Sequence, residues 1–139
     1  MTLWSAQLLP VGVVRYKSLE VNFTPGYLAA VVRAFDAGAV AVVPFQHVEP
    51  GGEPTADPGR CRGEVRSLEV VRDGLEMVVD VGPEGDLVLR NTPALRAAPR
   101  LVERYKTADG RVFLVVLQFV FATEKPVAQG LRPFRELDS

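Results

Sequence analysis

Residues 112–123 read Val-Phe-Leu-Val-Val-Leu-Gln-Phe-Val-Phe-Ala-Thr, and this stretch decides the class of fold. β-Branched and aromatic residues dominate it, and they favour the extended backbone of a strand. Asp109-Gly110 precedes the stretch, and a second apolar run, residues 95–105, precedes that dipeptide. Asp-Gly between two such runs is a strong signal for a β-hairpin. The sequence therefore predicts a long antiparallel hairpin here.

Working outward, the same pattern recurs nearer the N-terminus. Residues 63–71 and 75–81 flank Arg72-Asp73-Gly74, which predicts a second hairpin. Residues 18–23 alternate apolar and polar side chains, the period of a short strand. The apolar runs 6–16 and 39–45 predict two further strands, the first with an edge or bulge at its proline.

One clear helix is expected over about residues 25–37. Thr24 is suited to cap its N-terminus, and proline follows at the first helical position. Apolar residues at Leu28, Val31 and Phe35 follow helical spacing, and Gly38 marks the stop. A second, shorter helical segment is expected from Pro83 onward.

These elements sum to a single α+β domain, residues 1–139. Six or seven strands, two hairpins and one main helix predict a mostly antiparallel, closed or nearly closed β-barrel. No internal repeat or linker divides the chain.

Composition narrows the functional classes. The net charge of −1 is unlike that of a protein that coats duplex nucleic acid, which is usually basic. The chain has neither an apolar run long enough to cross a membrane nor a secretory signal. We therefore expect a cytoplasmic protein with no nucleic-acid or membrane partner.

Metal and cofactor sites are not expected. The single cysteine, Cys61, and the single histidine, His47, give no metal-ligand spacing, and Gly51-Gly52 lacks the context of a phosphate-binding loop. Cys61 is best interpreted as a small residue in or beside a strand rather than as a nucleophile.

His47 is the residue most open to a catalytic interpretation. It follows an apolar run and precedes a loop, residues 49–60, rich in proline and glycine. Loops on rigid scaffolds often carry catalytic groups, and histidine is the usual general base near neutral pH. Taken alone, a single histidine at a strand end more often has a structural role.

From His47 onward, the order of short motifs resembles the tailed-phage prohead (capsid maturation) serine proteases, including the Mu-type I protein. The similar pieces are Arg62-Gly63-Glu64-Val65, the stretch 68–75, Pro83-Glu84-Gly85, the stretch 95–103, Ala122-Thr123-Glu124-Lys125-Pro126 and the tail Gly130-Leu131 with Pro133. The resemblance covers about residues 19–134, and it rests on the order of the pieces rather than on any one of them.

The resemblance implies a fold like the herpesvirus assemblin barrel and the chemistry of a serine protease. It implies His47 as the general base and Ala98 at the position of the nucleophilic serine. It also implies Phe119 at the position where some relatives carry a second histidine. The implied partners are phage capsid and scaffold proteins inside the assembling prohead in the host cytoplasm, with self-association possible.

Hairpin geometry agrees with part of this alignment. A two-residue turn at Asp109-Gly110 would place Ala98 across from Phe121, and Phe119 would then be a diagonal neighbour on the same face. A register slip of one residue would put positions 98 and 119 on opposite faces. Neither a methyl group nor a phenyl ring can act as nucleophile or proton carrier, so this chain is expected to be catalytically inactive.

Three interpretations of the inactive site stay open. Ala98 can be an engineered or selected replacement of the serine in a real prohead protease. The chain can instead be a natural pseudoprotease, kept as a scaffolding or capsid-binding module in phage head assembly. Outside this class, it can be an unrelated small β-barrel interaction module.

Overall fold

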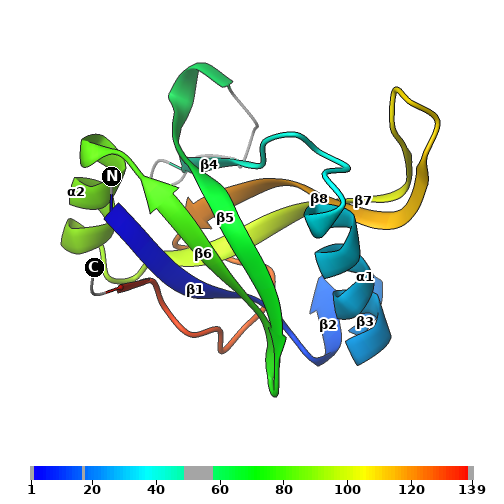
Figure 1. The fold of residues 1–139 in the computed structure, drawn as a ribbon. Coiled ribbons are helices and arrows are strands. Elements are labelled where there is room, and N and C mark those ends of the chain that lie inside the picture. The colour runs from blue at the N-terminus through cyan, green and yellow to red at the C-terminus, as the bar shows by residue number, and fades with distance from the viewer. Residues whose placement is uncertain (1, 17, 49–57, 138–139) are drawn as a thin grey trace.

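The computed structural model describes residues 2–16, 18–48 and 58–137 (Figure 1). Within these ranges there are two α-helices, α1 (Pro25–Asp36) and α2 (Pro83–Asn91), together with a 3-10 turn, η1 (Pro58–Arg60). The strands are β1 (Thr2–Pro10), β2 (Gly12–Tyr16), β3 (Leu19–Phe23), β4 (Pro44–His47), β5 (Cys61–Val71), β6 (Gly74–Val81), β7 (Arg96–Lys106), β8 (Val112–Thr123) and β9 (Arg135–Glu136).

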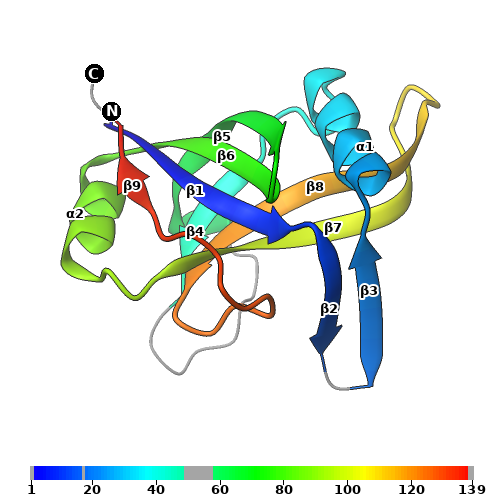
Figure 2. The same cartoon turned by 90° about the horizontal axis from the view of Figure 1, so that it is seen from below.

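Seven strands form one mixed sheet in the order β7-β8-β4-β5-β6-β1-β9. Every neighbouring pair in it is antiparallel except β4 and β8, which run parallel. Strands β2 and β3 form a separate antiparallel ribbon that projects beside the sheet (Figure 2). Both expected hairpins are present, as β5–β6 and β7–β8.

The expectation of a closed or nearly closed barrel is wrong. The sheet is open, and its two outer strands are β7 and β9. Strands β1 and β7 come close in space (Figure 2), but β1 already has β6 on one edge and β9 on the other. Because the short β9 occupies the edge that closure would need, no ladder joins β1 to β7.

Two expected strands also differ from the structure. The run 6–16 is divided between β1 and β2, because the chain bends after Pro10, where Gly12 adopts a φ of 114°. The run 39–45 is mostly irregular, and strand pairing begins only at Pro44. Before it, the amide of Ala39 still bonds the Ala34 carbonyl at 3.0 Å, so the chain is completing the end of α1.

Helix α1 closes the core against the sheet. The Thr24 hydroxyl accepts a hydrogen bond from the Tyr27 amide at 3.1 Å, the cap that the sequence predicts. Leu28 and Val31 are fully buried on the inner face of α1. They pack with Leu8, Phe45, Leu75, Met77, Val79, Val81, Val115, Leu117 and Val120. Each such side chain contributes about 1.5–3 kcal/mol by leaving water.

Candidate functional site

Positions 47, 98 and 119 lie on three neighbouring strands, β4, β7 and β8. In the β7–β8 ladder Ala98 is opposite Phe121 and Ala97 is opposite Ala122. In the β4–β8 ladder His47 is opposite Ala122. The three strands therefore place His47 in one row with Ala97, and Ala98 in the next row.

Adjacent rows present their side chains to opposite faces of a sheet. Ala97 and Ala122 belong to the main core, as does Phe45, two residues before His47. Phe121 instead belongs to a small second cluster on the other face. His47 therefore lies on the face opposite Ala98, and β8 stands between their strands, which puts β4 and β7 about 10 Å apart. The structure does not bring the implied base and the implied nucleophile position together.

Ala98 and Phe119 do share a face. Together with Val48, Phe121 and Cys61 they form what we call the outer cluster. The rings of Phe119 and Phe121 stack, with centroids 4.8 Å apart. The side chain of Cys61 is half-exposed and packs against this cluster. The outer cluster contains no group that could take or donate a proton beside Ala98, except the Cys61 thiol.

The pairing of Ala98 with Phe121 results from two irregularities of the hairpin, each of which shifts the register by one residue and which cancel each other. Strand pairing ends at Lys106 and Val112, so the loop has an odd number of residues and shifts the register by one. A bulge at Gln118, between the pairs Arg100–Phe119 and Leu101–Leu117, shifts the register back. The predicted pairing at position 98 is confirmed, although the turn itself differs.

Neither Thr92 nor Thr123 has a base hydrogen-bonded to its hydroxyl group. Thr123 is buried and its hydroxyl accepts a hydrogen bond from the Lys125 amide at 3.1 Å. Thr92 ends helix α2. In the part of the chain that the structure describes, no group of three or more His, Cys, Asp or Glu side chains could hold a metal ion.

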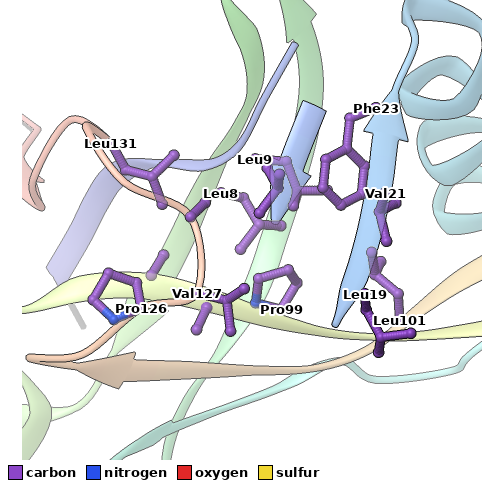
Figure 3. A pocket seen from close by; sticks show the side chains of 14 residues that line it. Leu8, Leu9, Leu19, Val21, Phe23, Pro99, Leu101, Pro126, Val127 and Leu131 are labelled. Carbon is purple, nitrogen blue, oxygen red and sulfur yellow. The ribbon is translucent and has the colours of Figure 1, made fainter. Parts of the chain in front are cut away.

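A groove beside β7 is the feature that the sequence did not reveal (Figure 3). It measures about 250 Å³, and every residue that lines it is apolar. The lining residues are Leu8, Leu9, Val14, Leu19, Val21, Phe23, Ala97, Ala98, Pro99, Leu101, Pro126, Val127, Ala128 and Leu131. Four separate parts of the chain meet here: the end of β1, the β2–β3 ribbon, β7 and the segment 126–131.

The β2–β3 ribbon turns one apolar face toward this groove. Val14 pairs with Val21 and both line it, as does Leu19 two pairs further along. The charged pair Arg15–Glu20, with nitrogen and oxygen 3.0 Å apart, lies on the alternate face. The apolar alternation in residues 18–23 is visible in the sequence, but its solvent exposure is not.

Part of the groove is open to solvent. Leu19 on one wall is 67% exposed and Val127 on the other is 46% exposed. Figure 3 shows Leu19 and Val21 on one side and Pro126 and Val127 on the other, with Leu8 and Leu9 between them. Single apolar side chains are common on protein surfaces and need no explanation. Large apolar side chains that gather in one exposed hollow are instead typical of a binding surface.

Comparisons with family models, with curated proteins and with solved structures give no match for this chain. Within the described residues, no helix is long and apolar enough to cross a membrane.

Proposed function

We propose that this chain is a non-catalytic binding module that holds an apolar segment of a partner protein in the groove beside β7. The groove itself supports this proposal. Its lining is wholly apolar, and Leu19 and Val127 at its mouth are exposed. Burying such side chains against a partner returns the free energy that their exposure costs, about 25 cal/mol per Å² of apolar area.

The partner class that we propose comes from the resemblance to prohead proteases. A binding module of that lineage would act on major capsid or scaffold proteins during phage head assembly. This is the pseudoprotease interpretation, and it agrees with the separation of His47 from Ala98. A binding module needs no catalytic pair, so the separation of His47 on β4 from Ala98 on β7 does not affect this function.

The direct test is a titration of the ¹⁵N-labelled chain with the peptide N-acetyl-Leu-Val-Leu-amide, followed by amide chemical shifts. We expect shifts confined to the residues that line the groove. Leu19→Glu and Val127→Glu should each weaken binding at least tenfold. Leu87→Glu is the matched control, because Leu87 is 59% exposed on α2, outside the groove. Shifts spread over the surface, or equal weakening by all three changes, would contradict the proposal.

The partner class has its own test. The chain is mixed with purified major capsid protein of the cognate phage and sedimented. Co-sedimentation that Leu19→Glu abolishes and Leu87→Glu preserves, without any processing of the capsid protein, supports the pseudoprotease interpretation.

A maturation protease whose serine is replaced by Ala98 is the second candidate, and one observation favours it. Ala98 lines the groove, so a nucleophile there would stand beside any segment bound in it. Ala98→Ser should then cleave the cognate capsid or scaffold protein. An Ala98→Ser chain that binds the capsid protein and leaves it intact rejects this candidate.

A further inference from the structure

Strand β7 extends past the groove as an edge strand with an unusual charge pattern. Its partner on one side is β8, and among the described strands none pairs with its other edge. Ala97, Ala98, Pro99 and Leu101 line the groove. A bound segment that leaves the groove along this strand passes the residues from Arg100 to Lys106.

The cations of this stretch have no carboxylate partners. Arg100, Arg104 and Lys106 are exposed, and none of their side chains makes a hydrogen bond or ion pair with a residue in the described ranges. Arginines on other elements hold carboxylates, as Arg66 holds Asp80 at 2.8 Å and Arg62 holds Glu84 at 3.0 Å. Within the described residues, Arg33 on α1 and Arg72 in the β5–β6 turn are also exposed and unpaired, but β7 gathers three such cations within seven residues.

The single anion of this strand, Glu103, is also exposed. Its carboxylate lies close enough to Tyr27 of α1 to raise the pKa of that tyrosine. Arg96, at the start of the strand, directs its guanidinium to the backbone carbonyls of Pro93 and Leu95, both at 2.9 Å. The exposed side chains of β7 beyond the groove thus carry three positive charges against the single negative charge of Glu103.

From this we infer that the partner segment is extended and acidic, with an apolar anchor in the groove and carboxylates against Arg100, Arg104 and Lys106. The inference rests on the proposed binding function and specifies the chemistry of its partner. A stretch from Arg100 to Lys106 measures about 20 Å at strand spacing, which is the reach of a segment of about seven residues. The anchor supplies affinity, and the charge pairs supply selection among partners.

A second copy of this chain is a poorer occupant of the same surface. Two β7 edges laid antiparallel with Glu103 opposite Glu103 would place Arg100 opposite Lys106, and like charges opposed across strands are destabilising. Lysine and arginine on an edge strand are a known protection against such self-pairing. The charges thus favour an acidic partner over self-association.

Arg104 bears on how the segment is held. Its φ is 52°, the single left-handed value at a residue other than glycine in the described chain. This conformation interrupts the regular pleat of β7, so a partner beyond it meets side chains rather than a continuous backbone ladder. From Arg104 onward, charge rather than backbone pairing therefore decides which partner segments bind along β7.

The test uses fluorescein-labelled peptides and fluorescence anisotropy. The probes are Leu-Val-Leu-Ser-Glu-Ser-Glu-Ser-Glu and the same sequence reversed, since either chain direction is compatible with the surface. Each has a counterpart with lysine in place of glutamate. We expect at least one acidic peptide to bind tenfold or more tightly than its lysine counterpart, and high salt to remove the difference.

Substitutions in the protein complete the test. Combined Arg100→Glu and Lys106→Glu should reverse the preference, so that the lysine peptide binds better. Arg135→Glu is the matched control, because Arg135 is exposed on β9, the outer strand at the other end of the sheet order. It should leave the preference unchanged.

The outcomes separate this inference from the proposed function. If acidic and lysine peptides bind equally, and Leu19→Glu weakens both, the acidic partner is wrong while the binding groove stands. If neither peptide binds and the apolar tripeptide also fails, the proposed function is wrong as well. Sedimentation equilibrium gives the third outcome: a dimer that Leu19→Glu dissociates would show that a second copy occupies the groove, which overturns the acidic partner.

Discussion

Gly63 of β5 lies so close to β6 that a Cβ atom on it would stand 2.2 Å from the carbonyl oxygen of Asp80. Real Cβ atoms do not approach backbone oxygen so closely, and a backbone atom in a ladder cannot turn away. Gly63 is paired on both sides, with Phe45 of β4 and Val81 of β6. Glycine is therefore required where these three strands meet.

Gly63→Ala should lower the free energy of unfolding by about 3 kcal/mol or more, at the upper end for overpacked sites. Urea unfolding followed by circular dichroism measures this. Gly82→Ala is the control, because its added Cβ would meet nothing nearer than the Arg62 carbonyl oxygen at 3.8 Å. Equal stability of the two variants would show that β5 can move away from β6.

The Tyr27 hydroxyl predicts a loss of stability in alkali. Burial raises the pKa of Tyr27, and the charge and hydrogen bond of Glu103 raise it further. A raised pKa means that the folded state holds its proton more tightly than the unfolded state. The stabilisation is therefore complete below about pH 10, the ordinary value for tyrosine, and declines as the pH rises above it.

Tyr27→Phe should remove this decline, which is measured as the slope of unfolding free energy against pH between pH 9 and 11. Tyr105→Phe serves as the comparison, because Tyr105 packs in a neighbouring apolar cluster and should leave the slope as it is. A slope that both variants retain would mean that other groups cause the alkaline loss.

Asp86 predicts the opposite dependence in acid. The hydrogen bond from Arg90 holds the pKa of Asp86 below its ordinary value, against the effect of burial, and Trp4 adds a second hydrogen bond at 3.0 Å. A lowered pKa contributes stability above the unfolded value, about pH 4, and the contribution is lost as the pH falls.

Asp86→Asn should flatten the fall in thermal midpoint between pH 5 and pH 2, and lower the midpoint at pH 7. Asp36→Asn is the comparison, since Asp36 is an exposed carboxylate at the end of α1 that no residue in the described ranges holds. If Asp86→Asn and the wild-type chain fall in parallel, this carboxylate does not govern acid stability.

Because of the bulge at Gln118, removing one residue from the β7–β8 hairpin should cost much more stability in strand β8 than in the loop. Deleting Gln118 removes the residue that restores the register, so one part of β8 must turn its core side chains outward. We expect this deletion to remove most of the unfolding free energy, which is about 5–15 kcal/mol for a domain. Thermal unfolding measures the loss.

Deleting Ala108 takes one residue from the same hairpin, but from its exposed loop. Loop length affects stability weakly, so we expect a cost of about 1 kcal/mol. A Gln118 deletion as mild as this one would mean that the strand adopts another register without loss of the core.

Most of the strands and helices can be predicted from the sequence, because the patterns that indicate them are local. The Thr24-Pro25 start of α1 and the β5–β6 and β7–β8 hairpins follow from residues a few positions apart. The run 39–45 shows the limit of such signals. Val43 and Phe45 of this run are buried in the core, which explains their apolar character, but most of the run has no strand partner.

The sequence by itself determined an α+β chain with two long hairpins, a capped helix and no usable nucleophile at position 98, because propensity, turn chemistry and side-chain identity need no distant neighbour. Tertiary structure alone decided the rest. The tail strand β9 pairs with β1 and leaves the sheet open, and β8 separates His47 from Ala98. The apolar groove arises where β1, the β2–β3 ribbon, β7 and the segment 126–131 converge. These relationships join residues up to the full length of the chain apart, and only packing sets them.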